Sequence, residues 1–344
     1  MNGIPPVDLG PYASAVPDQV VDRLRDARHV LTICHENPEA DALGSALANA
    51  LLVEHLGGTA TPVCADPMPE MYRFLPGMDR FRREPDRSID YDLIVVGDCG
   101  ELDRIGPVLD THRDLFDRVP ILDIDHHASN RHFGAFDWIE PFSSATCEMV
   151  TLLAWRLGVP LDSFGGMLAF ALAGGVIMDT GSFQHPNVTP RTMVVAAALR
   201  EAGAPLSEIA RRLYRSKPNT QLLLFGRVLA RLGSSLEGKL VWSTLELADL
   251  VATGAASAES EGLVDLLAQS SSSEASILFK EGSNGATRIS VRTRDGGVDA
   301  TVLTGTFGGG GHARAAGATV QLPLDEARTA VLARATELVE AVKR

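Results

Sequence analysis

The stretch from His35 to Asp41 holds an imidazole and carboxylates at a spacing suited to binding a metal ion. It reads His-Glu-Asn-Pro-Glu-Ala-Asp, so that His35, Glu39 and Asp41 share one short turn. Carboxylate oxygens and imidazole nitrogens are both ligands that divalent cations accept in proteins. A solvated turn in which Asp41 caps the following helix would use the same residue types. The choice between the two interpretations depends on what else the chain brings to this turn.

The segments on either side of the turn predict a strand before it and a helix after it. Val30–Cys34 is a short apolar run rich in β-branched residues, as expected of a buried strand. Ala42–Leu56 has apolar residues at helical spacing and is followed by Gly57 and Gly58, which favour a helix end. A turn between a strand and a helix lies at the carboxyl edge of a parallel sheet, where such folds bind ligands.

Further predicted strands alternate with predicted helices, and several end in acidic or histidine residues. Alternation of this kind predicts an α/β fold with a doubly wound, mostly parallel sheet. Beyond Thr59–Cys64, the strand Tyr91–Gly97 runs into Asp98. The strand Pro120–Ile124 runs directly into Asp125-His126-His127. An apolar helix, Met167–Met178, leads into Asp179, where an unpaired carboxylate would be costly.

The side chains gathered at this sheet edge form one set: His35, Glu39, Asp41, Asp98, Asp125, His126, His127 and Asp179. Such a set could hold two divalent cations that share a bridging carboxylate. Two cations about 3.5–4 Å apart would clamp the attacking and leaving oxygens of a phosphoryl displacement and generate hydroxide near neutral pH. The mixed ligands favour Mn²⁺ over Mg²⁺, which stays possible, and the lack of thiolate partners argues against structural Zn²⁺.

From Lys239 onward the pattern changes and predicts a second, smaller α+β domain. Its predicted elements are the strands Leu240–Leu245, Ser276–Lys280, Thr287–Arg292 and Ala318–Leu322, the helices Gly262–Leu267 and Leu324–Lys343, and a hairpin turn at Asp295–Gly297. The predicted organisation is a metal-binding domain over residues 1–202, a helical bridge over residues 203–235 and a substrate-binding domain over residues 236–344, with the active site in the cleft between the two domains. The basic run Arg211–Lys239 fits a solvated amphipathic helix better than a nucleic-acid contact.

The second domain contains a glycine run, Gly308–Gly311, that is suited to a close approach by an anion. Glycines let backbone N–H groups come near a phosphate, as in phosphate-binding loops. His312 and Arg314 follow the run, and Arg292 lies on a preceding predicted strand, so positive groups are available. A tight turn is an equally good interpretation of the glycine run by itself.

In combination, these motifs resemble the DHH/DHHA1 phosphoesterases: His35-x-x-x-Glu39-x-Asp41, Asp98, Asp125-His126-His127, Asp179 and Gly-Gly-Gly-Gly-His312-x-x-Ala-Ala-Gly317. The resemblance extends from about residue 20 to about residue 335 and is closest to the bacterial branch of nanoRNases and pAp phosphatases, which includes cyclic-di-AMP phosphodiesterases. It implies two domains, two cations and short nucleotides as substrates. The family pattern usually has Asp where this chain has Glu39, whose longer side chain must fold back to reach the same ion.

The resemblance also implies a role for each matching residue. One cation would be held by His35, Glu39 and Asp98, and the other by Asp41, Asp98, His126 and Asp179, with Asp98 as the bridge. Asp125 would support the site from behind the ligands, and His127 would approach the scissile phosphate. The predicted catalytic residues are thus Asp98, Asp125, His126 and His127. The predicted contacts to the non-reacting end of the nucleotide are Arg292, Gly309, Gly310, Gly311, His312 and Arg314.

Composition excludes several classes of partner. The net charge of −13 argues against tight binding of long duplex nucleic acid or of an anionic membrane. No apolar run reaches the length of a membrane span, and the N-terminus lacks the features of a signal peptide. The cysteines show no CxxC spacing and lie in or beside apolar runs, which predicts a reduced, cytoplasmic protein.

The sequence therefore predicts a cytoplasmic, Mn²⁺-dependent phosphoesterase that acts on di- to oligoribonucleotides, a cyclic dinucleotide or pAp, and the resemblance adds a homodimer. A RecJ-like single-strand exonuclease is one alternative, opposed by the acidic balance and the short chain. A type II inorganic pyrophosphatase would share the metal motifs, but the Gly-Gly-Gly-Gly-His segment argues against it. A nucleotide-binding sensor with degenerate metal sites is the alternative outside enzymes, and only Glu39 supports it.

Overall fold

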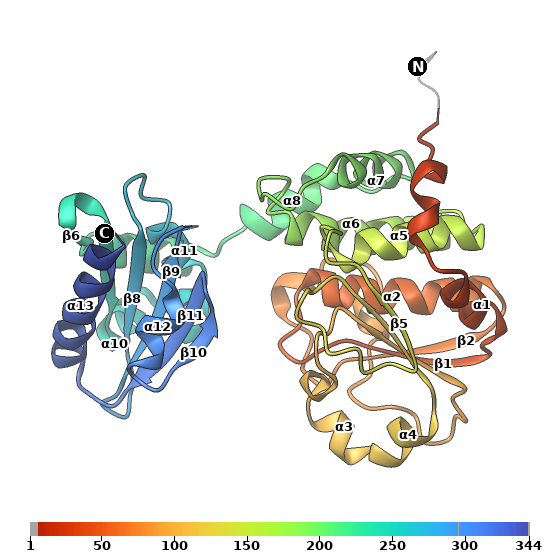
Figure 1. Cartoon of the computed structure of the whole chain (residues 1–344), viewed down its shortest axis with the longest axis horizontal. Helices are drawn as coiled ribbons and strands as arrows, with labels where there is room; N and C mark the ends of the chain where they lie inside the picture. Colours follow the sequence, from red (N-terminus) through yellow and green to blue (C-terminus); the bar gives the residue numbers. More distant parts are fainter. Residues whose placement is uncertain (1–5, 295, 343–344) are drawn as a thin grey trace. The chain divides into compact units, whose positions relative to one another are not determined.

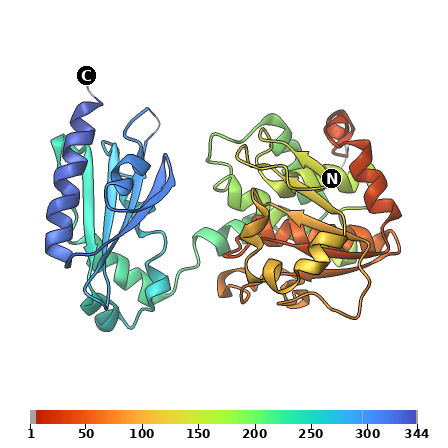
Figure 2. The same cartoon turned by 60° about the horizontal axis from the view of Figure 1, so that its bottom comes forward.

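The chain divides into two compact units, Met1–Ser216 and Lys217–Arg344, called unit 1 and unit 2 below. This computed structural model describes residues 6–294 and 296–342, and Figures 1 and 2 show it from two sides. Asp295 of the predicted hairpin turn and Lys343 of the predicted last helix lie outside the described residues. The predicted bridge over residues 203–235 spans the division between the units, and its bounds stay a prediction. No helix among the described residues is long and apolar enough to cross a membrane.

Unit 1 is built on a five-stranded, fully parallel sheet in the order β2-β1-β3-β4-β5. The strands are β1 (His29–Ile33), β2 (Thr59–Val63), β3 (Leu93–Gly97), β4 (Ile121–Asp125) and β5 (Phe136–Ile139). Strand β1 lies between the edge strand β2 and β3, so the chain first moves from β1 to β2 and then crosses back to β3, β4 and β5 on the other side of β1. This arrangement confirms the predicted doubly wound fold, although the short edge strand β5 carries no strong sequence pattern and was not predicted.

Helices cover both faces of the unit 1 sheet (Figure 1). The helices of unit 1 are α1 (Asp18–Asp26), α2 (Ala40–His55), α3 (Pro107–Thr111), α4 (Arg113–Arg118), α5 (Thr146–Leu157), α6 (Met167–Asp179), α7 (Pro190–Glu201) and α8 (Leu206–Tyr214). Of these, α6 packs on α2, and α7 and α8 pack on α6 rather than on the sheet itself. Alternate strand residues face opposite sides: Val30 belongs to the hydrophobic core that contains α2, α5 and α6, whereas Leu31 belongs to the core that contains α3 and α4. Because both sheet faces are covered, the strands are apolar on both sides and their polar residues collect at the carboxyl ends.

Unit 2 is built on a six-stranded mixed sheet in the order β10-β11-β9-β8-β7-β6. The strands are β6 (Gly233–Ser235), β7 (Leu240–Leu245), β8 (Ala275–Glu281), β9 (Thr287–Thr293), β10 (Gly310–His312) and β11 (Ala315–Val320). Only β7 and β8 are parallel to each other. The helices are α9 (Asn219–Leu229), α10 (Leu247–Thr253), α11 (Leu263–Leu267), α12 (Ala300–Gly305) and α13 (Leu324–Ala341).

Two hydrophobic cores lie on the two faces of the unit 2 sheet. The first joins α12 and α13 to residues such as Ile277 and Val291, and Figure 2 shows α13 along this face. The second joins α9, α10 and α11 to Val241 and Leu278. The predicted α+β class is therefore confirmed. The hairpin predicted after β9 is wrong, because the chain enters α12 there before it returns as β10. Part of the glycine run is itself the edge strand β10 rather than a loop.

Five of the seven basic residues in the run Arg211–Lys239 pair with carboxylates of the chain itself. Arg211 and Arg212 pair with Glu208 on the same helix. Arg227 and Arg231 pair with Asp249, Arg231 also pairs with Glu246, and Lys239 pairs with Glu274. These partners lie outside the run, so its sequence alone looked unbalanced. Arg215 and Lys217 have no ion pair among the described residues, and the preference for a solvated helix over a nucleic-acid contact stays a prediction.

Candidate metal centre and anion pocket

His35 and Glu39 meet in the turn that follows β1. The His35 side chain is buried, and its Nδ1 lies 2.7 Å from the carbonyl oxygen of Glu36. This contact leaves Nε2 facing Glu39 Oε2 at 3.3 Å and Asp98 Oδ2 at 3.8 Å. Glu39 has a second task, because its other oxygen accepts a hydrogen bond of 2.8 Å from the Ala42 N–H and so caps α2. The Glu39 carboxylate therefore caps α2 with one oxygen and faces His35 with the other.

Asp41 does not cap its own helix, contrary to one interpretation of the sequence. It is fully buried in the first turn of α2, and its oxygens accept hydrogen bonds from the backbone N–H groups of Thr146 and Cys147 at 2.7 and 2.9 Å. These two groups are the first of α5, whose N-terminus carries partial positive charge. Asp41 thereby ties the start of α5 to the turn. Because Glu39 is the cap, α2 begins at Ala40, earlier than predicted.

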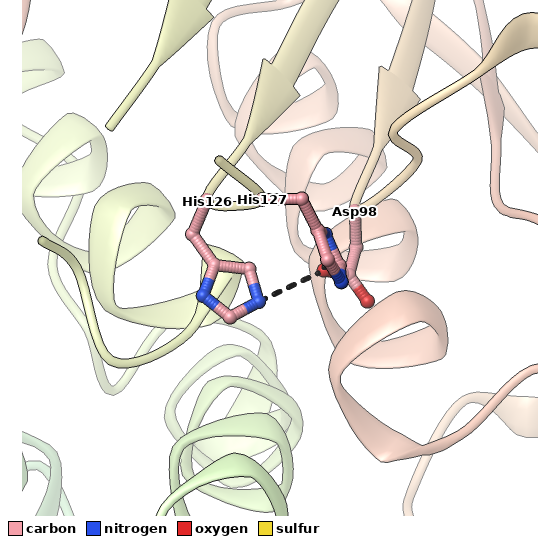
Figure 3. Close-up of side chains that lie close together, drawn as sticks. All are labelled: Asp98, His126 and His127. Carbon is pink, nitrogen blue, oxygen red and sulfur yellow. Dashed lines mark ion pairs between the residues drawn. The ribbon is translucent and has the colours of Figure 1, made fainter. Parts of the chain in front are cut away.

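Asp98 lies between the two histidine-bearing segments. It follows β3 with a left-handed backbone (φ 57°) and is 2 % exposed. Its Oδ1 accepts a hydrogen bond of 3.0 Å from the Thr146 hydroxyl and lies 3.5 Å from His126 Nε2 and 3.7 Å from His127 Nδ1. Figure 3 shows the three side chains converging from the ends of neighbouring strands. Asp98 thus lies beside His35, in the turn after β1, and beside the two histidines that follow β4.

The Asp125-His126-His127 segment ends β4 and aims its side chains differently. Asp125 is fully buried and its Oδ1 lies 2.7 Å from His127 Nδ1. His126 Nδ1 lies 3.2 Å from the carbonyl oxygen of Ser143, which fixes the ring so that Nε2 faces the carboxylates. Asp179, the last residue of α6, places its Oδ2 3.1 Å from this Nε2.

Among the described residues, three overlapping groups have ligand atoms within 4.8 Å of one another. They are His35 with Glu39 and Asp98, Asp41 with His126 and Asp179, and Asp98 with His126 and His127. Asp98 and His126 each belong to two groups, so the groups form one continuous cluster. The residues that the resemblance assigned to two cations therefore come together, while their role as ligands stays a prediction.

The charge in the cluster fits a cation. Burial and the neighbouring carboxylates raise the pKa of Asp98 well above its usual range. Burial and the charge of Asp179 raise the pKa of Asp41 to about 7. Burial lowers the pKa of His126, but its contact with Asp179 and the other carboxylates outweigh this and raise it to about 9. The cluster packs four carboxylates among three imidazoles, so the carboxylates repel one another when ionised, and divalent cations would offset this repulsion.

Asn130 is a supporting residue that sequence reasoning missed. Its side-chain nitrogen lies 2.8 Å from Asp125 Oδ2, 2.9 Å from Asp123 Oδ2 and 3.2 Å from the Cys99 carbonyl oxygen. Burial raises the pKa of Asp123 to about 8, although Asn130 opposes the shift. Asn130 therefore holds Asp125, which in turn holds His127. Its spacing of five residues from Asp125 was the available signal.

Unit 2 contains a cavity of about 880 Å³ on the sheet face that also packs against α11. Arg292, Gly310 and Gly311 line it, as predicted for substrate contacts. Lys280 and Arg288 line it as well and were not predicted. Neither belongs to a motif, and only the pairing of β8 with β9 places them side by side.

The other predicted substrate contacts in unit 2 do not line this cavity. His312 is exposed at the end of β10, opposite Ala315. Arg314 directs its guanidinium to the backbone carbonyl oxygens of Arg294 and Val298 and so braces the segment after β9. A Cβ on Gly309 would lie 2.2 Å from the Gly317 carbonyl oxygen, so glycine is needed there for chain packing.

Comparison with known proteins agrees with this arrangement. The DHH family N-terminal domain matches residues 29–174, and the DHHA1 domain matches residues 240–341. The bifunctional oligoribonuclease and PAP phosphatase NrnA of Thermus thermophilus is 33 % identical over 87 % of this chain and 86 % of its own. The protein of the same name from Bacillus subtilis is 28 % identical over 83 % of this chain and 87 % of its own.

A solved structure shows the same fold over nearly the whole length. An exopolyphosphatase-related protein from Bacteroides fragilis aligns with a TM-score of 0.83 at 22 % identity, covering 95 % of this chain and 97 % of its own. The matched domains follow each other in the order expected from the motifs. The chain therefore belongs to the DHH family of phosphoesterases and carries a DHH domain followed by a DHHA1 domain.

Proposed function

We propose that this enzyme hydrolyses short nucleotides, namely oligoribonucleotides of a few residues, the linear dinucleotide pApA, and pAp, with the help of two Mn²⁺ ions. The observation that carries the proposal is the continuous cluster in which Asp98 and His126 each belong to two possible ligand groups. The substrate class is supported by the names of the two relatives, which describe them as oligoribonucleases and PAP phosphatases.

The residues proposed to hold the first cation are His35, Glu39 and Asp98, and those for the second are Asp41, Asp98, His126 and Asp179. Bound cations would supply positive charge to the phosphoryl oxygens and acidify a water molecule. Carboxylate-rich sites with imidazole suit Mn²⁺, whose coordination sphere is more tolerant than that of Mg²⁺. The chain prepares the site beforehand, because hydrogen bonds from Thr146 and Cys147 already fix the carboxylates.

His127 is proposed to contact the substrate directly. Its Nδ1 is engaged by Asp125 at 2.7 Å, so Nε2 is the ring nitrogen left for a phosphoryl or leaving-group oxygen. The side chain of His127 is 39 % exposed, whereas that of Asp125 is buried, which fits a residue that meets substrate and a residue that orients it. Burial raises the pKa of Asp125, but the contact with His127 outweighs it and lowers this pKa below its usual value, so the carboxyl stays ionised and can orient the His127 ring.

The same proposal extends to cyclic-di-AMP as a further substrate, to a homodimer and to a cytoplasmic location. The first rests on the wider family branch that the motifs resemble. Sedimentation equilibrium tests the dimer, and turnover of cyclic-di-AMP beside pApA tests the substrate.

The decisive experiment measures turnover on a substrate panel after removal and return of metal. Chelator-treated protein should be inactive, and Mn²⁺ should restore hydrolysis of pApA and pAp more effectively than Mg²⁺. Chromatography should show mononucleotides from pApA and inorganic phosphate from pAp. His126→Ala should abolish turnover, while His132→Ala, an exposed histidine outside the cluster, serves as the matched control.

Two results would replace the proposal. Nucleotide binding without turnover under either metal would favour the sensor with degenerate metal sites. Turnover that rises with the length of single-stranded substrates, rather than falling beyond a few nucleotides, would favour a RecJ-like exonuclease.

A further inference from the structure

Residues 143–147, which lead into α5 and are called the frame segment below, contact most of the proposed second cation site. Hydrogen bonds of this segment reach three of the four proposed ligands, namely His126, Asp98 and Asp41. The fourth, Asp179, is the last residue of α6 and shares no direct hydrogen bond with the frame segment among the described residues. The position of its Oδ2, 3.1 Å from His126 Nε2, therefore depends on another contact.

Asn187 supplies a link between Asp179 and the frame segment. Its side-chain nitrogen donates to the Ser144 carbonyl oxygen at 3.0 Å and to the Asp179 carbonyl oxygen at 3.2 Å. A primary amide has two N–H donors, so one asparagine side chain can bridge two carbonyl groups. Asn187 Oδ1 is buried and makes no hydrogen bond within the described part of the chain, so this amide acts through its nitrogen.

The frame segment is itself anchored from behind by Glu148. This residue is fully buried, and its Oε2 accepts hydrogen bonds from the Ser144 hydroxyl and, at 2.8 Å, from the Thr192 hydroxyl. Its Oε1 accepts a hydrogen bond of 2.5 Å from Arg191 Nε. Thr192 and Arg191 lie in the first turn of α7. The loop from α6 to α7 is therefore fastened to the frame segment twice, once through Asn187 and once through the start of α7.

The same loop begins with a strained turn directly after Asp179. Three successive residues have left-handed backbones, with φ of 55°, 57° and 66°: Gly181, Ser182 and Phe183. This conformation is ordinary for glycine but unfavourable for the other two, and it persists only where surrounding contacts fix it. Two backbone N–H groups donate to the Thr180 carbonyl oxygen and reverse the chain, which brings Asn187 back beside Asp179. The strain is thus spent on returning this amide to the cluster.

His185 contacts the same carbonyl group as Asn187 but does not reach the frame segment. Its Nδ1 lies 3.0 Å from the Asp179 carbonyl oxygen, and its side chain is exposed. Both residues can therefore steady the end of α6. Only Asn187 also joins that end to Ser144, so the two residues separate the two effects.

We propose that Asn187 is a positioning residue for the second cation. By joining the Asp179 and Ser144 carbonyl groups, it fixes the Asp179 carboxylate relative to His126. The proposal deepens the proposed function, on which it rests for the presence of a second cation. Removal of a group that orients a metal ligand usually weakens metal binding by about 10- to 100-fold. Loss of Asn187 should therefore weaken the second cation and spare the first, whose proposed ligands are His35, Glu39 and Asp98.

The test measures Mn²⁺ binding to the full-length protein without any substrate. Chelator-treated protein is titrated with Mn²⁺, and electron paramagnetic resonance of the free ion gives the number and affinity of the bound ions. The variants are Asn187→Ala and Asn187→Ser, whose hydroxyl keeps one short donor. His185→Ala removes the other contact to the Asp179 carbonyl group. Thr189→Ala is the structural control, because it removes the cap of α7 without touching Asp179.

We expect the parent to bind two Mn²⁺ ions per chain, as the proposed function requires. Asn187→Ala should raise the dissociation constant of one ion by about tenfold or more and change that of the other by less than about threefold. Asn187→Ser should lie between the parent and Asn187→Ala. His185→Ala should change neither constant by more than about threefold. Thr189→Ala should lower the urea midpoint of unfolding, measured in chelator, and leave both constants unchanged.

Three results overturn the proposal. They are parent-like binding of both ions by Asn187→Ala, a loss in His185→Ala as large as that in Asn187→Ala, and fewer than two ions bound by the parent. A lower urea midpoint in Asn187→Ala with unchanged Mn²⁺ binding belongs to the first case and would make Asn187 a structural residue. If Asn187→Ala does not fold, Asn187→Ser decides, and it must weaken one ion by about threefold or more.

Failure of this proposal is distinguishable from failure of the proposed function, because no nucleotide is present in the test. A parent that binds two ions but hydrolyses no nucleotide would remove the proposed function and keep Asn187 as a positioning residue, provided that Asn187→Ala loses one ion. An active parent whose Asn187→Ala variant binds both ions normally would keep the proposed function and remove this role of Asn187.

Discussion

The metal cluster of unit 1 and the cavity of unit 2 are built in opposite ways. In unit 1 the polar side chains are buried and fixed by backbone groups, as with Asp41, which accepts hydrogen bonds from Thr146 and Cys147. In unit 2 the floor is open, and Arg288 has no partner among the described residues. A buried carboxylate without a partner would be costly, whereas an exposed guanidinium is solvated by water. The fold therefore fixes the side chains of the cluster closely and leaves those of the cavity floor free to adapt.

The largest effect is expected at Asp98, the residue shared by both halves of the cluster. Asp98→Asn keeps the size of the side chain and suits the left-handed backbone at φ 57°. It removes the proposed bridging charge, so turnover should fall by about 10³ or more. Turnover on pApA and bound metal per chain are the measurements. A folded variant with near-normal turnover would break the contrast between a fixed cluster and an adaptable cavity, because the cluster would then tolerate loss of its shared member.

A smaller effect is expected at Glu39, where this chain departs from the family pattern. Glu39→Ala loses both the proposed ligand and the cap of α2, so turnover should fall by about 10² or more and stability by about 1 kcal/mol. Glu39→Gln keeps an oxygen for the Ala42 N–H but loses the negative charge. Glu39→Asp should preserve turnover or raise it at low Mn²⁺.

Metal titration of turnover separates the two tasks of Glu39. If Glu39 is a ligand, Glu39→Gln should need more Mn²⁺ than the parent for half-maximal turnover, while its unfolding midpoint stays near that of the parent. A titration curve of Glu39→Ala that coincides with the parent would reduce Glu39 to a helix cap and strengthen the one-metal or sensor alternatives.

The sequence predicted unit 1 well because parallel strands deliver their last residues to one edge. Strand ends such as Asp98 and Asp125 can be identified in the sequence, and topology brings them together whatever their separation. Glu39 was harder, because the cap of α2 was assigned to Asp41, and both residues have suitable side chains. Only the packing of α5 against this turn shows which carboxylate caps α2. Asn130 was missed because an amide that orients an acid has no signature beyond its spacing.

Unit 2 was less predictable, because its cavity depends on cross-strand pairing rather than on strand ends. Lys280 and Arg288 are neighbours only through the register of β8 and β9, which no local pattern records. Arg314 looked like a substrate contact because it follows the glycine run, but in the fold it braces backbone carbonyls. The missed helix α12 has the same origin, since a Gly-Gly pair after a strand also fits a hairpin turn.

A moderate effect is expected at Asn130, which supports the cluster without touching the proposed cations. Asn130→Ala frees Asp125 Oδ2, and the looser Asp125 no longer fixes His127. Turnover should fall by about tenfold or more, as is usual for residues that orient a catalytic group. The Mn²⁺ concentration for half-maximal turnover should not change, and His132→Ala is the nearby control. If Asn130→Ala also needed more Mn²⁺ for half-maximal turnover, Asn130 would contribute to metal binding and would not act only by orienting His127.

The smallest effect on turnover, and a clear effect on stability, is expected at Asp249 in unit 2. This carboxylate is buried and receives hydrogen bonds from Arg227 and Arg231. Burial raises its pKa, but the hydrogen bonds from the two arginines outweigh burial and hold it below the usual range. A carboxylate with a lowered folded-state pKa stabilises the fold above its unfolded value, near pH 4, and this contribution is lost as the pH falls through the folded-state value.

Asp249→Asn should therefore lower the free energy of unfolding by about 1–3 kcal/mol at pH 7, with turnover per folded molecule unchanged. Urea titrations at pH 7 and at about pH 3 are the measurement, and the gap between parent and variant should shrink at the lower pH because protonation removes the same charge from the parent. Asp325→Asn, which breaks an exposed pair, should cost less than about 1 kcal/mol at either pH. A gap that is equally large at both pH values would mean that Asp249 acts through packing. The buried carboxylate of unit 2 would then not act as a fixed charge, and the contrast with unit 1 would be sharper than the ion pairs of Asp249 suggest.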